Sequence, residues 1–239
     1  QGSSYLGHIA DADIAEAVAT GRFEATTDFA RCAEVDAVLI AVPTPLTKYR
    51  DPDLSYVTST CEAIAPHLRA GAMVILESTT FPGTSAEVMK PILESCSDLV
   101  VGDNLDLAYS PEREDPGNAD FGTQTIPKLV GGYTPETTAR AVTLYERALD
   151  RVIAVDSMEV AELAKLFENI FRAVNIALVN ELKMVCDRMG INVWSVIEAA
   201  ATKPFGFMPF YPGPGIGGHC IPVDPHLLEW KFFDHQSQD

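Results

Sequence analysis

This 239-residue sequence lacks the features of membrane proteins, of nucleic-acid-binding proteins and of disulfide or zinc proteins. It has no uninterrupted apolar run of about 18 residues, the length that suggests a membrane-spanning helix. The best candidate, residues 170–182, is broken by Arg172, Asn175, Asn180 and Glu181. Basic residues are scarce, with 17 Lys and Arg against 34 Asp and Glu, and the resulting net charge of −17 disfavours binding to nucleic acid or anionic membranes. We therefore expect no nucleic-acid or membrane partner.

Cysteine pairs are missing as well. The five cysteines are odd in number and form no CxxC motif, which disfavours a disulfide framework and a thiolate zinc site. No signal peptide is recognisable. This pattern fits a reducing cytoplasm, and we expect no metal site, because His219, Cys220, Asp224 and His226 lack the usual ligand spacing.

The composition that is present, 47% hydrophobic and 21% charged, is that of a globular protein. Short apolar runs alternate with helical patterns through the first two-thirds of the chain. They predict strands at residues 36–42, 72–76, 105–109, 128–130 and 151–155, and helices at residues 53–68, 84–94 and 134–149. Such alternation predicts an α/β fold with a doubly wound, mostly parallel, Rossmann-like sheet.

One long helix is predicted next, from about residue 157 to residue 189. Asp156 and Glu159 stand at capping-box spacing, and Gly190 is a suitable C-terminal cap. The helix is apolar around most of its circumference, which is typical of a buried helix.

A small helix at residues 193–201 follows, and then a loop at 203–222 that is rich in proline, glycine and aromatic residues. We divide the chain into a Rossmann-like domain, residues 1–155, and a central helical segment, residues 156–239.

The opening of a dinucleotide-binding fold is not recognisable. Such a fold normally begins with a strand, a GxGxxG turn and a helix. Gly2 and Gly7 do not make that motif, and no strand pattern precedes them. We expect the Rossmann-like domain to be truncated at its N-terminus.

Polar groups follow three of the predicted strands: Val42-Pro43-Thr44-Pro45, Ser78-Thr79-Thr80 and Ser110-Pro111-Glu112-Arg113. Ligands of doubly wound sheets lie beyond the carboxyl ends of the strands. Taken singly, such Thr and Pro residues can simply terminate strands. Taken together, they predict a ligand-binding rim.

The long helix also carries a polar stripe, because Glu162, Lys165, Asn169 and Arg172 recur at spacings of three, four and three. A solvated face is one interpretation. The flanking positions are apolar, however, and an amine beside an amide suits the stabilisation of an oxyanion. A catalytic role is the second interpretation.

The loop 212–224 places four glycines just before Cys220, with Asp224 four residues later. Glycines let the backbone approach a ligand closely, and an exposed cysteine near cations can become a nucleophile. The alternative is a small packed residue after a loop. Lys203 could offset phosphate charge or be an ordinary surface lysine, and Tyr211 belongs to an aromatic group that could stack on a ligand ring or pack as core.

Six blocks of the sequence resemble, in order, those of the UDP-sugar dehydrogenases, the UDP-glucose/UDP-N-acetylhexosamine 6-dehydrogenase family. They are VPTP (42–45), ESTTFPG (77–83), SPEREDPG (110–117), AELAKLFEN (161–169), VNIALVNELK (174–183) and GPGIGGHCIPVDP (213–225). The loop TKPFGFMPFYPGPG (202–215) most resembles that of bacterial members that oxidise UDP-N-acetylhexosamines, especially UDP-N-acetylglucosamine.

The resemblance implies a four-electron oxidation of the sugar C6 alcohol to a carboxylate, with two NAD⁺ and a thioester on Cys220. Lys165 and Asn169 match the residues that stabilise the alkoxide. Glu112 and Thr79 match those that handle protons and water, and Asp224 matches a supporting acid. The implied NAD contacts are Val42, Pro43, Thr44, Ser78 and Thr79; the implied substrate contacts are Glu112, Arg113, Lys165, Asn169, Lys203, Tyr211 and Gly217.

Family members also have a C-terminal UDP-binding domain, which this chain does not include. We therefore expect the isolated chain to be inactive. We also expect, as a separate hypothesis, a homodimer formed through the long helix. Two other functions stay open: a two-electron hydroxyacid dehydrogenase, which has no need of Cys220, and a non-catalytic, truncated dimer scaffold.

Overall fold

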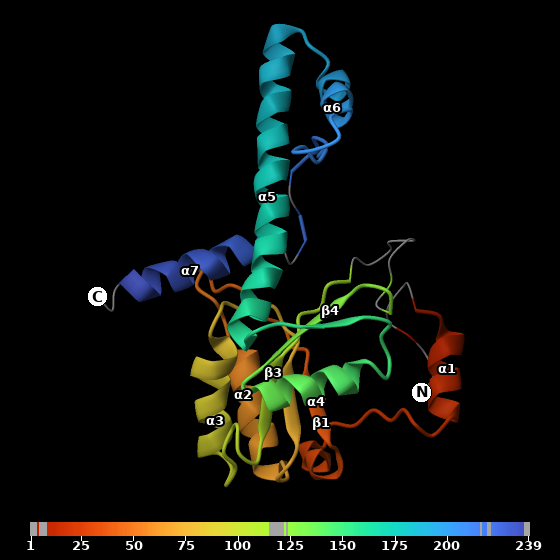
Figure 1. Cartoon of the computed structure of the whole chain (residues 1–239), viewed down its shortest axis with the longest axis vertical. Coiled ribbons are helices and arrows are strands. Elements are labelled where there is room, and N and C mark those ends of the chain that lie inside the picture. The colour runs from red at the N-terminus through yellow and green to blue at the C-terminus, as the bar shows by residue number, and fades with distance from the viewer. Residues whose placement is uncertain are drawn as a thin grey trace.

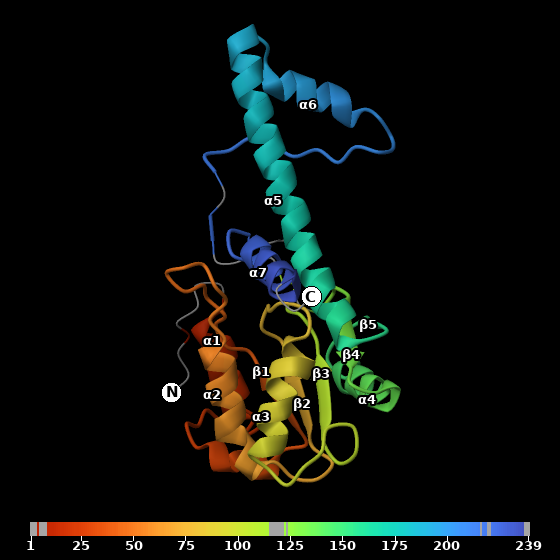
Figure 2. The same cartoon turned by 90° about the vertical axis from the view of Figure 1, so that its left-hand side faces the viewer.

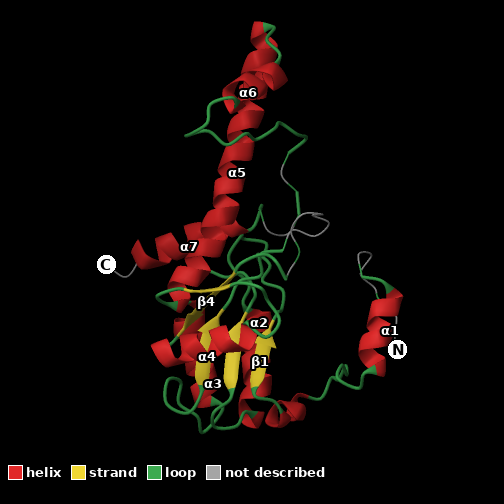
Figure 3. Ribbon diagram, turned by 45° about the vertical axis from the view of Figure 1, so that its right-hand side comes forward, coloured by secondary structure: helices red, strands yellow, loops and turns green. Residues whose placement is uncertain are grey.

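The computed structural model describes residues 4, 9–114, 122, 124–215, 217–218 and 221–236. A five-stranded sheet with strand order β1-β2-β3-β4-β5 forms its centre (Figure 3). β1, β2 and β3 are parallel, β4 is antiparallel to β3, and β5 is parallel to β4. The strands are β1 (Ala37–Ile40), β2 (Met73–Leu76), β3 (Asp106–Tyr109), β4 (Lys128–Gly132) and β5 (Val152–Ala154). The predicted mostly parallel, Rossmann-like sheet is confirmed.

Helices cover both faces of the sheet because its middle strands are apolar on both sides. All four residues of β2 are buried. α2 (Ser55–Ile64) and α3 (Lys90–Ser95) lie on one face, and α4 (Pro135–Tyr145) lies on the other (Figures 1 and 2). Two apolar clusters fill the two layers; the larger contains Val74, Leu76, Leu107 and Tyr109, and the smaller contains Met73, Ile75, Ala108 and Val130.

Prolines shorten two of the predicted helices. α2 ends at Ile64 and continues as the 3₁₀-helix η2 (Ala65–His67), which contains Pro66. The helix predicted at 84–94 begins instead as a π-helix, η3 (Thr84–Met89), and becomes α-helical only at Lys90. Pro91 has no backbone N–H to donate to the preceding turn, which accounts for the wider π geometry there.

Three helical segments were not predicted: α1 (Asp11–Ala19), the 3₁₀-helix η1 (Phe29–Glu34) and α7 (Asp224–Gln236). α1 buries none of its residues and lies to the side of the sheet (Figure 3). α7 begins against the lower part of the long helix and extends away from it to one side (Figure 1). The Asp224-Pro225 pair is a helix-start signal, because aspartate and proline both favour the first turn.

The long helix is α5 (Met158–Met189), close to its predicted bounds. The predicted capping box of Asp156 and Glu159 is wrong. Ser157 is the N-cap, and its hydroxyl accepts a hydrogen bond from the Val160 N–H. Gly190 ends the helix in the left-handed conformation, as predicted.

Only the first third of α5 packs on the sheet domain, which corrects the prediction that the whole helix is buried. Beyond it the helix projects outward, and α6 (Val193–Ala201) folds back beside its far end (Figure 1). No sheet is present there to cover the helix, so its apolar side chains stay exposed, among them Val174, Leu178, Met184, Val185 and Met189. None of the described helices is long and apolar enough to cross a membrane.

Gly131 allows the start of α5 to lie directly on β4. A Cβ atom at this position would overlap the carbonyl oxygen of Ser157, the N-cap residue of the helix. Backbone atoms cannot move aside as a flexible side chain can. The placement of α5 on the sheet therefore depends on the absence of a side chain here.

Replacement of Gly131 by alanine is expected to lower the free energy of unfolding by about 1–3 kcal/mol, the usual cost of overpacking. Urea unfolding monitored by circular dichroism measures this value. Gly122→Ala is the control, because a Cβ there meets no atom within 4 Å. Equal stability of the two variants would show that α5 does not lie against Gly131.

Candidate active site

The loops after β1 and β2 lie side by side at the carboxyl edge of the sheet and form a rim; its binding of a ligand stays a prediction. The Val42 N–H donates to the Ser78 hydroxyl at 2.9 Å, and that hydroxyl donates to the Val42 carbonyl oxygen at 2.7 Å. The Thr44 hydroxyl donates to the Thr79 carbonyl oxygen at 2.6 Å. Val42, Pro43, Thr44, Ser78 and Thr79 are thus held together by hydrogen bonds between the two loops.

The first third of α5 carries the polar stripe into the interior. Glu162, Lys165 and Asn169 are all buried, whereas Arg172, one turn further, is exposed. The solvated-face interpretation therefore holds for the guanidinium but not for the buried amine and amide, whose catalytic role stays a prediction. Three buried polar side chains in a row are costly unless they have partners.

Asp224 is the partner of Asn169. The side-chain amide of Asn169 donates to the Asp224 carboxylate at 2.5 Å, across 55 positions of the sequence, and Asp224 is only 2% exposed. Burial raises the pKa of Asp224 to about 6, against the opposing effects of the Asn169 hydrogen bond and the nearby Lys165 charge. An amine, an amide and a carboxylate thus meet where α7 begins against α5.

Glu112 lies elsewhere on the rim and is engaged by its own set of partners. Its carboxylate accepts from the Lys128 ammonium at 3.1 Å and from the N–H groups of Arg113 and Glu114. Burial opposes its ionisation, but the Lys128 charge and these hydrogen bonds hold its pKa below the usual range. In the described part of the chain it forms no hydrogen bond or ion pair with Lys165, Asn169 or Asp224.

Arg113 is tied to the long helix. Its guanidinium pairs with the Glu168 carboxylate at 2.6 Å and donates to the Pro127 carbonyl oxygen at 2.6 Å. These contacts link the loop after β3 to α5. The predicted substrate contact of Arg113 stays a prediction.

Lys203 and Tyr211 lie at the far end of α5. The Lys203 ammonium lies over the Phe205 ring at 5.0 Å, and Tyr211 stacks on Trp194 at 5.9 Å. The adjacent Gly213 N–H donates to Asn180, which lies about 22 Å along the helix from Lys165 at 1.5 Å per residue. Within this chain the structure does not bring Lys203 and Tyr211 to the buried polar stripe.

The loop that carries the predicted nucleophile is described only in part. Gly217 is exposed and makes no close contact at its Cβ position. Cys220 and His219 lie outside the described residues. No group of three His, Cys, Asp or Glu side chains in the ranges that the structure describes could hold a metal ion.

Some polar residues near the rim were not identified from the sequence. Lys128, which is nearly buried, also pairs with Glu77 at 3.0 Å, and the Tyr145 hydroxyl donates to Glu77 at 2.6 Å. The buried hydroxyls of Thr80 and Tyr109, at the ends of β2 and β3, have no hydrogen-bond partner among the described residues. A lone lysine opening an apolar strand, as Lys128 does, is the one sequence signal that could have found this group.

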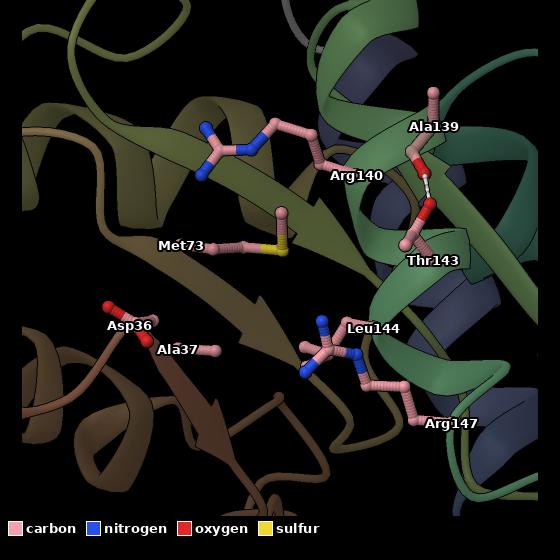
Figure 4. A pocket seen from close by; sticks show the side chains of 8 residues that line it. All are labelled: Asp36, Ala37, Met73, Ala139, Arg140, Thr143, Leu144 and Arg147. Atoms are coloured by element: carbon pink, nitrogen blue, oxygen red, sulfur yellow. Dashed lines mark hydrogen bonds between the residues drawn. The ribbon is translucent and has the colours of Figure 1, made fainter.

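A pocket of about 400 Å³ lies between α4 and the starts of β1 and β2 (Figure 4). Its lining includes Asp36, Met73, Arg140 and Arg147. Arg140 is occupied by Asp106 and by the Gly71 carbonyl oxygen. Because ligands of such sheets bind at the opposite, carboxyl edge, this pocket is not a candidate active site.

Comparison with protein families identifies the chain. Residues 4–149 match the NAD-binding domain of the UDP-glucose/GDP-mannose dehydrogenase family, and residues 159–238 match the central domain of the same family. The chain belongs to this family of NAD-dependent oxidoreductases.

Several relatives are named for their substrates. A UDP-N-acetyl-D-mannosamine dehydrogenase of Escherichia coli K12 is 42% identical over 231 residues, which cover 92% of this chain and 54% of the relative. A UDP-N-acetyl-D-glucosamine 6-dehydrogenase of Pseudomonas aeruginosa is 38% identical over 222 residues, 92% of this chain and 52% of the relative. The chain thus spans about half the length of the curated relatives it matches.

Among solved structures, a UDP-D-ManNAc dehydrogenase from Pyrococcus horikoshii matches with a TM-score of 0.87 and 35% identity. The match covers 95% of this chain and 55% of that structure. The family thus has both the fold and the long helix described above.

The rim fits the cofactor that the family implies, NAD. Val42, Thr44 and Thr79 lie at the carboxyl ends of two adjacent parallel strands, where dinucleotides bind in such sheets. The buried Thr80 hydroxyl, which has no protein partner in the described ranges, adds a free polar group beside them. When bound there, NAD supplies a hydride acceptor.

The raised pKa of Asp224 predicts a specific pH dependence of stability. Because the folded-state pKa of about 6 exceeds the unfolded value of 3.8, the stability that proton binding contributes is complete below pH 3.8 and is lost as the pH rises through about 6. Asp224→Asn replaces the ionisable carboxyl with a neutral amide and so removes this loss of stability with rising pH. Between pH 4 and 7 the variant should gain on the order of 2 kcal/mol relative to the unsubstituted protein.

Chemical unfolding at half-unit pH intervals measures this difference. Asp98→Asn, in the loop before β3, is the control. A difference between the Asp224 variant and the unsubstituted protein that stays constant from pH 4 to 7 would contradict the burial of an ionisable Asp224.

Proposed function

We propose that this chain forms the catalytic middle of an NAD-dependent nucleotide-sugar dehydrogenase that oxidises C6 of a UDP-N-acetylhexosamine to the uronic acid. The observation that carries the proposal is the buried meeting of Lys165, Asn169 and Asp224, which joins two segments 55 positions apart. Family membership supports the reaction class.

The buried triad suits a developing alkoxide. In a site of low dielectric constant, an ammonium and an amide donor stabilise negative charge on oxygen much more than they do in water. Asp224 accepts from the Asn169 amide and so fixes its orientation, with the other amide hydrogen free to donate to substrate. Asp224 also lies near enough to Lys165 to be affected by its charge.

Cys220 is the proposed nucleophile, four residues before Asp224 in the sequence. Loss of a hydride and a proton from the C6 alcohol gives an aldehyde, and the Cys220 thiolate adds to its carbonyl carbon. Loss of a second hydride leaves a thioester, which water hydrolyses to the carboxylate with return of the thiol. Two hydrides leave in total, so two NAD⁺ are reduced.

Glu112 and Thr79 are proposed to handle protons and the hydrolytic water. The ion pair with Lys128 keeps Glu112 ionised, which suits a general base. Glu112 lies on the sheet rim and Lys165 on α5, so the substrate would lie between them.

The proposed substrate has an N-acetylated hexose. Relatives named for UDP-N-acetyl-D-mannosamine are 40–43% identical to the chain, and the relative named for UDP-N-acetyl-D-glucosamine is 38% identical. These names support the manno epimer as a candidate substrate, whereas the loop at 202–215 predicted the gluco epimer. The choice between them stays a prediction.

A homodimer through α5 is also proposed. The outer part of the helix exposes a row of large apolar side chains, with Val174 59%, Leu178 64% and Met189 65% exposed. Exposed apolar surface of this extent along one element is typical of a protein interface. A second copy of the chain would cover it.

Two NADH per sugar oxidised is the result that the proposed function predicts. The assay uses a chimera in which the matching half of the Escherichia coli relative is replaced by this chain. The substrates are the gluco, manno and galacto epimers of the UDP-N-acetylhexosamine, together with UDP-glucose. A ratio of one would support a two-electron hydroxyacid dehydrogenase instead.

Cys220→Ser in the same chimera tests the thioester step. Acid production should fall at least about 10³-fold, because the aldehyde can no longer be captured as a thiohemiacetal. Cys96→Ser, at a partly exposed cysteine after α3, is the matched control and should change little. Unchanged acid production by the Cys220 variant would rule out the covalent mechanism.

Leu178→Glu should convert a dimer of the 239-residue chain to a monomer, because a buried, unpaired charge is costly at an interface. Light scattering measures the mass. Val100→Glu, at another exposed apolar residue in the loop before β3, is the control. A monomeric unsubstituted chain would contradict the proposed dimer.

A further inference from the structure

Glu162 is the most completely buried charged side chain of α5, with 0% exposure, and the reaction proposed above gives it no role. Its carboxylate accepts three hydrogen bonds, from the Gly83 N–H at 2.6 Å, the Ser85 N–H at 3.0 Å and the Ser85 hydroxyl at 2.8 Å. All three donors belong to one turn, so both oxygens of Glu162 are committed to a single segment.

That turn connects the cofactor rim to η3. It begins directly after Thr79 and Thr80, and Gly83 adopts a positive φ of 95° to enter the π-helix. The space where a Cβ of Gly83 would lie is filled by the Glu87 carboxylate, so the turn has little room to move. A shift of the turn would move the rim with it.

α7 holds the same segment from its other side. The Lys231 ammonium pairs with Glu87 at 2.5 Å and lies over the Phe81 ring, which is packed beside Trp230. Phe81 also belongs to an apolar cluster with Leu166 of α5 and Leu227 of α7. Both α5, which carries Lys165 and Asn169, and α7, which carries Asp224, therefore contact the Phe81–Ser85 turn.

We propose that Glu162 is a positioning residue that fixes the distance between the cofactor rim at Thr79 and the oxyanion-stabilising pair Lys165 and Asn169. Glu162 lies one turn before Lys165 on the same face of α5, and its hydrogen bonds anchor that face to the turn after Thr79. The importance of this role for turnover rests on the proposed function. The anchoring itself does not.

A carboxylate suits this task better than an amide. Three donors point at Glu162, and an ionised carboxylate is acceptor-only, whereas glutamine or a protonated carboxyl presents a donor of its own. Burial raises the pKa of Glu162 to about 7, against the lowering effects of its hydrogen bonds to Ser85 and Gly83; Glu159 raises it further. Among the described groups, the Glu162 charge also acts on Tyr109 of β3. Glu87 of η3, which pairs with Lys231 of α7, lies against Gly83, one of the two residues that donate to Glu162.

The anchor should therefore tighten as the pH rises through about 7. Global stability depends on pH in the opposite direction. Because folding raises the pKa of Glu162, the stability that proton binding at Glu162 contributes is complete below pH 4.5 and is lost as the pH rises through about 7. A purely structural role would make local protection follow global stability. A positioning role predicts that local protection of the turn rises with pH while the contribution of Glu162 to global stability falls.

Amide hydrogen exchange of Gly83 and Ser85 in the 239-residue chain tests the anchor, measured from pH 5.5 to 8.5 and corrected for intrinsic rates. Protection of both amides should rise through about pH 7 in the unsubstituted chain. Glu162→Gln should lower it at least about tenfold at pH 8 and abolish the inflection, as expected for loss of hydrogen bonds to a charged acceptor. Glu181→Gln, at an exposed position on the outer part of the same helix, should behave like the unsubstituted chain.

Protection that is independent of pH in the unsubstituted chain, or that persists in Glu162→Gln, would overturn the proposal. Should Glu162→Gln fail to fold, Glu162→Asp and the titration of the unsubstituted chain decide it. Aspartate keeps the charge with a shorter reach, so it should retain the inflection at reduced protection. Loss of the inflection in the aspartate variant would count against the role of the charge.

The chimera assay separates positioning from chemistry. Glu162→Gln should lower kcat at least about tenfold while KM for the UDP-sugar changes less than about threefold, as expected when only transition-state geometry is lost. Equal effects on kcat and KM would contradict a positioning role. An unsubstituted chimera without dehydrogenase activity would instead refute the proposed function, and the exchange result would stand by itself.

Discussion

The structure depends on how the first third of α5 packs against the sheet domain. This contact combines the apolar packing of Met158, Ala161 and Leu166 with buried polar groups. Glu162 accepts from the turn after β2, and Asn169 donates to Asp224 at the start of α7. Unpartnered buried polar groups cost several kcal/mol, so these contacts form only in one register of the helix. One helix thereby fixes both the rim of the sheet after β2 and the start of α7.

The charge distribution explains how a chain of net charge −17 can belong to a family whose ligands are anions. Three lysines, Lys128, Lys165 and Lys231, are buried around the rim and the base of α5. Lys128 and Lys231 are paired with acids, whereas Lys165 has Asp224 nearby without a direct ion pair. Among the described residues only Lys165 of these three lacks a direct ion pair, so Lys165 and backbone donors, and not the overall field, are the groups proposed to receive a nucleotide sugar.

Much of the fold could be predicted because its signals are local. Pro43 and Pro45 end β1, Gly190 ends α5, and the apolar runs mark the strands. The antiparallel β4, the seat of α5 at Gly131 and the exposure of the outer helix could not be predicted, since each depends on packing between distant segments. The same holds within the site. The stripe on α5 was visible as a spacing, but the partners of Glu162 and Asn169 lie 77 or more and 55 positions away, respectively.

Carbon-detected NMR titration of the carboxyl groups of Glu162 and Asp224 in the 239-residue chain tests the seating of α5 most directly. Two buried carboxyls at the base of the helix should titrate at about 7 and about 6, respectively. Values near 4.5 and 3.8, those of exposed side chains, would show that the helix does not bury them and that the site described above does not form.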